Sequence, residues 1–454
     1  MENTQDLNNK PLSIKQYLLI SSLLFALFFG AGNLIFPIHL GQLAGSNWIS
    51  AALGFLCTGV LLPLLSVLAI SITKSNGVFD IAKPLGNKFA IIFMILVHAT
   101  LGPLFATPRT ATVTFAVGFQ PMIPAKYSGI ALLIISALFF AATYMISYKE
   151  NNITKQVGKI LNPIFLILLF IAFLLAFLHP MGNAGMQSIT SAYKNASFFN
   201  GFLEGYNTMD ALAGLAFGVT VVTAVKQLGK TSPKSNAKAT AWAGILSEIL
   251  VGIIYVILIW IGATSLELFK VASDGGPTFN QFMTHYLGST GNALLATLLT
   301  LTCLTTAVGL VSAFAQDFHN HFPKISYRQW LAINCGLSFI IANCGLNTII
   351  QWSTPVLMLL YPYAILLIIL SIFSPLFKKD AIVYVITIIC ITIPAFMDML
   401  ASLPAYAINN SFMQAIINFH NTYFPFAELG MDWVIPGTIG LIIGLIIHAF
   451  KNKK

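Results

Sequence analysis

A short stretch inside the first apolar segment, Gly30-Ala31-Gly32-Asn33, combines a free backbone with a polar amide. Glycine lacks a Cβ and loosens the backbone, and Pro37, which follows shortly after, has no N–H to donate. The Asn33 amide must find hydrogen-bond partners when it lies in hydrocarbon. These residues predict a broken helix, because broken helices persist at membrane depth where the freed groups line a cavity or bind a solute. The alternative is a glycine face for close helix packing.

The two ends of such a break have opposite polarity. The free N–H groups near Ala31 and Gly32 carry partial positive charge and suit a carboxylate. The freed carbonyl groups just before the break, between Ala26 and Phe29, suit a small cation. A site that binds an anionic group and a cation together is what an ion-coupled amino acid carrier requires.

A second interrupted segment contains Tyr206-Asn207-Thr208-Met209-Asp210. Asp210 is ionisable and lies in an otherwise apolar run, which makes it a functional candidate, with a helix-end cap as the alternative. A third polar group, Thr302, Thr305 and Thr306, offers oxygen ligands that match alkali cations better than soft metals. Threonine in a membrane helix also bonds its own backbone, and both interpretations stay open.

The composition identifies the elements that must position these residues. The chain has 454 residues, of which 57% are hydrophobic and 8% are charged, against about 25% charged in soluble proteins. It is therefore an integral membrane protein, and we expect a lipid bilayer as its solvent. A spanning helix needs about 20 apolar residues. Twelve spans are predicted: 17–43, 48–73, 88–118, 127–147, 159–179, 206–226, 239–264, 290–316, 328–343, 348–374, 380–400 and 433–450.

The basic residues are distributed asymmetrically between the loops. If both ends of the chain are cytoplasmic, 19 of the 23 basic residues lie in the cytoplasmic loops and tails, and 3 lie in the outer loops. The remaining one, Arg109, lies within a span. Positive charge is concentrated on the cytoplasmic side of membrane proteins. This distribution predicts cytoplasmic N- and C-termini in a cell membrane, and it explains the net charge of +9 without nucleic acid binding.

The two interrupted segments are five spans apart and oppositely oriented, which predicts an inverted repeat of five helices. The fold class expected is therefore all-α and polytopic, with a 5+5 inverted repeat and two peripheral helices. A single transmembrane domain would cover 1–454. Residues 16–180 would form the first repeat, 205–375 the second, and 376–454 the two added helices and the tail.

Two motifs carry a family resemblance. FFGAGNLIFP at residues 28–37 resembles the broken first helix of the leucine-transporter fold, and the spacing of Thr302, Thr305 and Thr306 resembles its eighth helix. Together with GYNTMDALA at residues 205–213, the chain resembles, from end to end, the bacterial branched-chain amino acid:cation symporters (LIVCS family, BrnQ type).

The resemblance implies uptake of leucine, isoleucine and valine with Na+ or H+, and no other cofactor. The amides of Ala31 and Gly32 would hold the substrate carboxylate, and Asn33 would serve a second cation or orient the loop. The substrate amine and side chain would meet the second segment around Tyr206, Thr208 and Asp210. The cation site would combine the carbonyls of Ala26, Phe29 and Thr302 with the hydroxyls of Thr305 and Thr306.

The coupling ion is open. The threonines favour Na+, whereas a span-five lysine replaces sodium in some proton-coupled relatives of this fold, and Lys159 opens that span. Lys159 and Asp210 are therefore candidates for proton coupling, although Lys159 can also extend to the cytoplasm. We expect no metal other than Na+ and no obligate protein partner.

The sequence lacks common motifs of enzymes, and several further polar residues have two interpretations. No nucleotide loop, HExxH motif or clustered acid pair indicates an enzyme, and a channel or a carrier of another small neutral amino acid remain alternatives. Arg109 and Glu248 could form a structural ion pair or a gate. His98 could relay protons or be a hydrogen-bonded core residue, and Asp317 is interpreted as solvated.

Overall fold

The computed structural model describes residues 12–148 and 153–451, without the side chains of residues 153–163, Pro233, Thr290, Asn292 and Leu295. Helices and their connecting turns make up this described part, which contains no strand. The main helices are α2 (Ile14–Phe28), α3 (Gly32–Ala44), α4 (Trp48–Leu56), α5 (Leu62–Thr73), α7 (Asn87–Ala99), α8 (Ala106–Thr114), α9 (Ser128–Tyr148), α10 (Ile153–Leu178), α12 (Ser197–Glu204), α13 (Asp210–Gln227), α14 (Pro233–Ser265), α15 (Gly275–His321), α16 (Tyr327–Ala342), α17 (Leu346–Phe373), α18 (Ala381–Ala401), α20 (Ser411–Tyr423) and α21 (Val434–Lys451).

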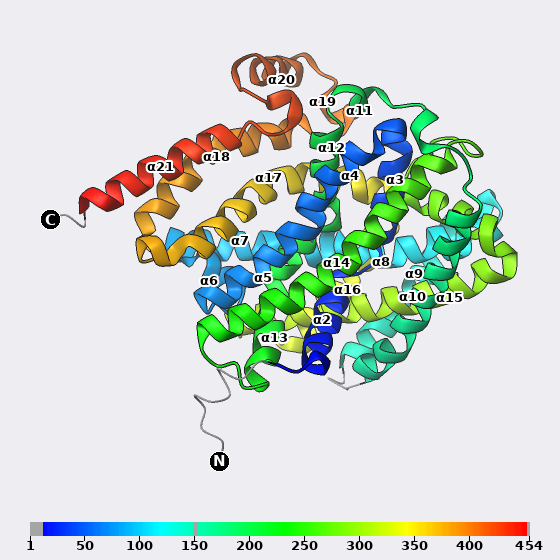
Figure 1. The fold of residues 1–454 in the computed structure, drawn as a ribbon, viewed down its shortest axis with the longest axis horizontal. Coiled ribbons are helices and arrows are strands. Elements are labelled where there is room, and N and C mark those ends of the chain that lie inside the picture. The colour runs from blue at the N-terminus through cyan, green and yellow to red at the C-terminus, as the bar shows by residue number, and fades with distance from the viewer. Residues whose placement is uncertain (1–11, 149–152, 452–454) are drawn as a thin grey trace.

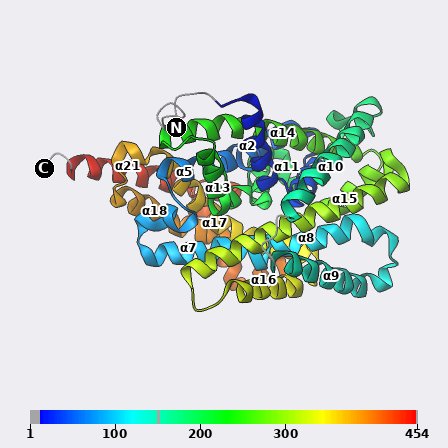
Figure 2. The same cartoon turned by 90° about the horizontal axis from the view of Figure 1, so that it is seen from below.

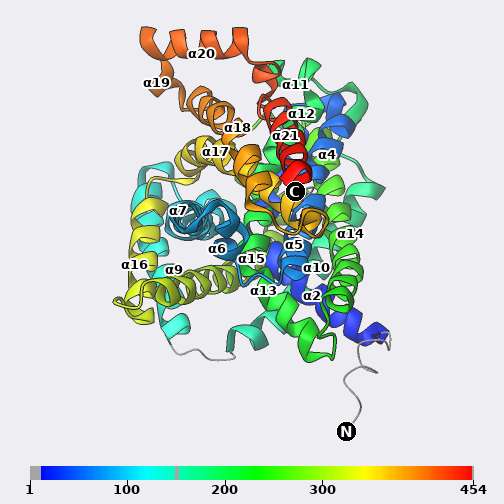
Figure 3. The same cartoon turned by 90° about the vertical axis from the view of Figure 1, so that its left-hand side faces the viewer.

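The helices form a bundle with a short cap at one end. In Figure 1 the first described helix, α2, lies at the bottom, and α20 lies at the top near α19 (Ala405–Ile408) and α11 (Ser191–Asn195). Figure 2 shows α7, α9, α15 and α16 on one side of the bundle, opposite α2 and α14. The connection through α19 and α20 projects beyond the bundle in Figure 3.

The described residues contain eight helices that are long and apolar enough to cross a membrane, or nine if the bent pair α12 and α13 counts as one span. This supports an integral membrane protein. One of them, Gly32–Thr73, runs for 42 residues. At about 1.5 Å per residue, that is roughly twice the ~30 Å hydrocarbon core. Gly45, with a φ of 50°, interrupts this run between α3 and α4.

The predicted break in the first helix is confirmed. α2 ends at Phe28, Phe29 adopts an extended conformation with a ψ of 104°, and α3 begins at Gly32. In an unbroken helix the Gly30 N–H would donate to the carbonyl of Ala26. Here it donates to Asn33 Oδ1 over 2.8 Å, so the side chain of Asn33 replaces a backbone acceptor.

The second predicted break is also present. A 3₁₀ turn, Gly205–Thr208, follows α12, and Met209 adopts a left-handed conformation with a φ of 62° before α13 begins at Asp210. The helices on either side meet at 42°. A left-handed conformation is uncommon for a residue with a Cβ, and it redirects the chain where Asp210 begins the next helix.

The broken helices pack on neighbouring spans through close backbone contacts. α2 and α3 pack on α14, whereas α12 packs on α4 and α13 on α5. At the α3–α14 crossing, a Cβ at Gly41 would overlap the carbonyl oxygen of Ile259, and one at Gly262 would overlap that of Ile38. These glycines allow the two backbones to approach, as small residues do in membrane helix packing.

Candidate functional site

A buried hydrogen-bond network joins the two breaks. Asn33 Nδ2 donates to Asp210 Oδ2 over 2.6 Å and also contacts the Tyr255 hydroxyl. The Tyr255 hydroxyl donates to the same carboxylate oxygen over 3.1 Å. Asp210 is the first residue of α13, where the helix dipole favours a negative charge. Its carboxylate bonds to α3 and α14, so the helix-end cap alternative does not describe its interactions.

The backbone at the start of α3 offers free donors. The hydrogen bonds recorded for the described residues include none from the N–H groups of Ala31 or Gly32. A Cβ at Gly32 would lie 3.2 Å from the Phe36 ring and 3.7 Å from an Arg109 guanidinium nitrogen. Position 32 therefore has little room for a side chain, and a cationic group lies close to it.

Arg109 is the cation beside this helix start. It lies on α8, is 3% exposed, and its guanidinium carbon stands 4.9 Å from the centre of the Phe36 ring. Its Nη1 is buried and has no hydrogen-bond partner among the described residues. The guanidinium interacts electrostatically with Asp210 and Glu204. An unpaired buried guanidinium next to free backbone amides is suited to bind a carboxylate.

The other side of the break faces the eighth span. A Cβ at Gly30 would lie 3.4 Å from Thr306 Cγ2 and 4.0 Å from its hydroxyl oxygen. The hydroxyls of Thr305 and Thr306 donate to the Thr302 carbonyl over 2.8 and 3.1 Å. Each hydroxyl oxygen keeps lone pairs that can accept a cation. The Thr302 hydroxyl is buried and has no partner among the described residues.

A cavity of about 290 Å³ lies next to both breaks. It is lined by Phe36, one turn after Gly32, and by Tyr206 and Asn207 from the second break. The apolar side chains of Leu357 and Met358 also line it. Its volume is close to the lower end of the ~300–1,000 Å³ range of ligand pockets, which suits a small solute. Ala31, Gly32 and Asp210 are not among the residues that line it.

The remaining predicted residues have separate places. Thr208 is buried, donates to the Gly205 carbonyl over 2.9 Å and accepts from the Asp210 N–H over 3.4 Å, so it supports the second break. Tyr206 stacks on Tyr361 of α17 with ring centres 4.0 Å apart. Lys159 lies on α10, and its side chain is outside the described part of the chain.

Sequence reasoning missed several interactions of the site. It did not identify Tyr255. The signal that could have found this residue is its hydroxyl group, which lies in an otherwise apolar span. The predicted Arg109–Glu248 ion pair is absent from the ion pairs of the described residues, and Arg109 instead interacts with Asp210 and Glu204. The side chain of Asp317, which was interpreted as solvated, is 29% exposed, and its Oδ2 also lies 2.7 Å from the buried His98 Nε2.

Solved structures identify the fold. The chain is similar to Mhp1, a nucleobase-cation-symport-1 family transporter, in a closed conformation, with a TM-score of 0.57 and 12% identity over 96% of this chain and 93% of that one. The inward-facing conformation of Mhp1 gives a TM-score of 0.61 at 13% identity, covering 96% and 91%. At these identities the likeness shows the fold alone, which is the leucine-transporter fold.

Curated relatives identify the family. The chain is 41% identical to the branched-chain amino acid permease BrnQ of Lactobacillus delbrueckii subsp. lactis, over 98% of this chain and 99% of the relative. It is 40% identical to BraB of Bacillus subtilis, with 97% of each covered, and 35% identical to BrnQ of Escherichia coli K12, with 93% of each covered. Residues 13–451 match the family of branched-chain amino acid transport proteins, and the chain belongs to that family. It is therefore a transport protein and not an enzyme.

Proposed function

We propose that this protein is a secondary transporter that imports leucine, isoleucine and valine across the bacterial cell membrane by symport with Na+ or H+. The observation that carries the proposal is the junction of the two breaks, where Asn33 bonds to Asp210 over 2.6 Å beside the free amides of Ala31 and Gly32. Its relatives are named as branched-chain amino acid permeases.

The substrate carboxylate would bind the N–H groups of Ala31 and Gly32 and the guanidinium of Arg109. A helix N-terminus binds anions. Arg109 Nη2 lies 3.7 Å from the position of a Cβ at Gly32, and Arg109 Nη1 has no hydrogen-bond partner among the described residues. The substrate amine would meet the second break, where Asp210 offers a carboxylate. Tyr206 and Phe36, together with Leu357 and Met358 of the cavity, would surround a branched aliphatic side chain.

The cation would bind on the carbonyl side of the first break. The Ala26 carbonyl loses its helix donor because the Gly30 N–H turns to Asn33, and Thr306 packs against Gly30. The carbonyls of Ala26 and Phe29, with the Thr305 and Thr306 hydroxyls, would form a sodium site. The Thr302 carbonyl accepts hydrogen bonds from both hydroxyls. It would have to give up these hydrogen bonds to become a ligand of the cation. Asp210 or Lys159 would carry the proton if H+ is the coupling ion.

Twelve spans in a 5+5 inverted repeat would organise this site. The helices of the first span pack on α14, and those of the sixth pack on α4 and α5. Span one therefore contacts span seven (α14), and span six contacts span two (α4 and α5). An inverted repeat relates span one to span six and span two to span seven, so the two sets of contacts are equivalent. This equivalence supports repeats at 16–180 and 205–375. Residues 376–454 would add two helices and the tail, and both termini would be cytoplasmic.

Competition of leucine uptake tests the proposed substrate class. Purified protein is reconstituted in proteoliposomes with imposed sodium and proton gradients, and uptake of labelled leucine is measured with each natural amino acid in excess. Isoleucine and valine should inhibit uptake most strongly. Strong inhibition by lysine or glutamate, without inhibition by isoleucine or valine, would contradict the proposal.

A further inference from the structure

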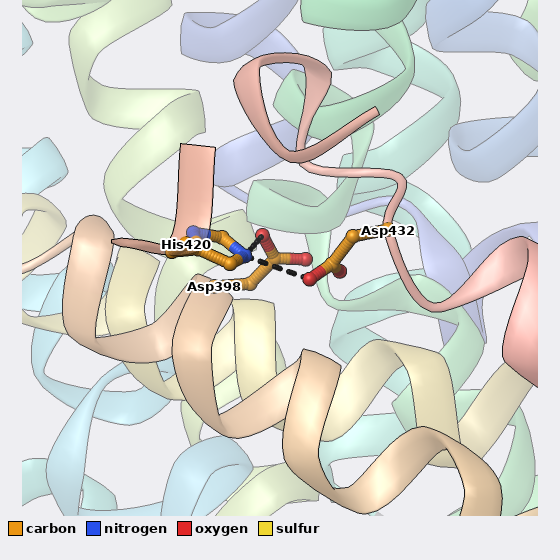
Figure 4. A group of neighbouring side chains, drawn as sticks. All are labelled: Asp398, His420 and Asp432. Carbon is orange, nitrogen blue, oxygen red and sulfur yellow. Dashed lines mark hydrogen bonds and ion pairs between the residues drawn. The ribbon is translucent and has the colours of Figure 1, made fainter. Parts of the chain in front are cut away.

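A buried cluster outside the candidate transport site brings together two carboxylates and one imidazole. Asp398 lies near the end of α18, His420 lies on α20, and Asp432 lies just before α21. Their exposed fractions are 2%, 1% and 0%. Figure 4 shows the three side chains directed toward one another from three separate segments. One ligand atom from each lies within 4.8 Å of the others, and this is the only such group among the described residues.

The protein groups alone leave this cluster incompletely satisfied. His420 Nε2 lies 2.7 Å from Asp432 Oδ2 and 3.7 Å from Asp398 Oδ1. A ring nitrogen carries at most one hydrogen, so Nε2 makes one short bond, to Asp432. Asp398 Oδ2 and Asp432 Oδ1 are buried and have no hydrogen-bond partner among the described residues. An ionised carboxylate that is buried without partners is costly, so the cluster has to take up either protons or a bound cation.

Charge balance specifies these two possibilities. Two carboxylates with a neutral imidazole carry two negative charges, so neutrality requires either two protons, one on the imidazole and one on a carboxyl group, or one divalent cation. A divalent cation neutralises both and accepts electron pairs from all three side chains. Buried charges in proteins are usually paired or bound to metals.

The geometry and the donor types favour zinc. Zinc binds nitrogen and carboxylate oxygen at about 2.0–2.2 Å with tetrahedral angles, so neighbouring ligand atoms should be about 3.3 Å apart. The two distances from His420 Nε2, 2.7 and 3.7 Å, lie on either side of this value, and the ligand atoms of the two carboxylates lie within 4.8 Å of each other. Magnesium and calcium prefer six or more oxygen ligands, which a set containing one imidazole does not provide.

We propose that Asp398, His420 and Asp432 form a zinc site that fastens α20 to the membrane helices. α20 packs on α18 and exposes Phe412, Phe419 and Tyr423 by 53–74%, so its remaining apolar contacts with the bundle are few. A metal bound by one residue from α20 and two from the flanking segments would hold it in place. The sequence spacing of these ligands is long and matches no short zinc motif, which is why no metal was expected there.

The site also lies next to the candidate transport cavity. Asp398 interacts electrostatically with Tyr206. Tyr206 and Ser402, the residue just after α18, both line that cavity. Zinc bound at this cluster would therefore stabilise the wall of the cavity on the α20 side. The metal proposal itself does not depend on which solute the cavity accepts.

Metal binding to the full-length protein tests the proposal. The protein is purified without a histidine tag, stripped with a chelator, and titrated with zinc by calorimetry, with melting temperature as a second readout. We expect one zinc per chain, a higher melting temperature with zinc, and no comparable effect of magnesium or calcium. His420→Ala and Asp432→Asn should each weaken zinc binding by about tenfold or more. His285→Ala, which removes an exposed histidine, should not.

Equal zinc binding by the wild type and His420→Ala would overturn the proposal. A second measurement is independent of whether the variants fold. Cobalt added to the stripped wild-type protein should produce the strong visible absorption of a tetrahedral site, and zinc should abolish it. Absence of that absorption in the wild type would leave the cluster as an ion pair without metal.

Discussion

Asn33 of α3 and Asp210 of α13 are 177 residues apart in the sequence, and their side chains are hydrogen-bonded at 2.6 Å. Asn33 uses its oxygen to hold the Gly30 N–H and its nitrogen to hold the Asp210 carboxylate. One side chain therefore fixes the loop of the first break and joins it to the start of the helix after the second. A movement of either broken helix changes this junction.

Substitution Asn33→Ala should reduce leucine uptake by about tenfold or more, because a hydrogen bond to a charged group contributes roughly 1.5–3 kcal/mol. It also leaves the buried carboxylate of Asp210 with one donor fewer. The matched control is Asn280→Ala, which removes the bond from Nδ2 to the Val117 carbonyl over 2.8 Å and the bond that Oδ1 accepts from the Thr284 hydroxyl over 3.5 Å. Initial uptake rates, normalised to protein in the membrane, provide the comparison. Equal rates in the two variants would contradict the role of Asn33.

Substitution Gly32→Leu should abolish uptake and leave membrane insertion intact. Its Cβ would already approach the Phe36 ring to 3.2 Å, and the rest of the side chain would fill the space in front of the free N–H groups. Gly336→Leu is the control, because a Cβ at this helical glycine meets nothing within 4 Å. Normal uptake by Gly32→Leu would support the packing interpretation of Gly30 and Gly32.

The sequence predicted the breaks because their causes are local. Gly30, Asn33 and Pro37 affect their own backbone, and Asp210 stands out in an apolar run. The partners of these residues were not predictable, because Tyr255 and Arg109 reach the site only through helix packing. A hydroxyl or a guanidinium in an apolar span indicates function but does not indicate which groups it meets. The Arg109–Glu248 pairing failed for this reason.

The coupling ion can be assigned by isosteric substitutions on the eighth span. Thr305→Val and Thr306→Val remove hydroxyl oxygens at nearly constant volume, and each should lower sodium-driven uptake by about tenfold. Thr297→Val is the matched control, since its hydroxyl also bonds its own helix, at the Ala293 carbonyl. Sodium and pH gradients are imposed separately on proteoliposomes. Uptake driven by pH alone in sodium-free buffer, and lost in Lys159→Ala, would assign the coupling to protons.

The anchor of the last helix should depend on pH. Asp380 Oδ2 lies 2.8 Å from His448 Nδ1, and bonds from His448 and from the Ile382 N–H lower the pKa of Asp380 below its ordinary value of 3.8. A lowered pKa in the folded protein contributes stability above the unfolded value, and that contribution is lost as the pH falls through the folded value. The melting temperature of Asp380→Asn should lie below that of the wild type at pH 7, and the difference should shrink below about pH 4. A constant difference at every pH would contradict this role.

Direct binding of leucine and of leucinol, which has a hydroxymethyl group in place of the carboxylate, tests the account most directly. The account places the carboxylate at the Ala31 and Gly32 amides and at Arg109, so purified wild-type protein should bind leucine at least about tenfold more tightly than leucinol. Arg109→Gln should reduce this preference, whereas Arg328→Gln, at an exposed arginine that stacks on Tyr148, should preserve it. Equal affinity of the wild type for the two compounds would contradict the central claim that the first break binds the substrate carboxylate.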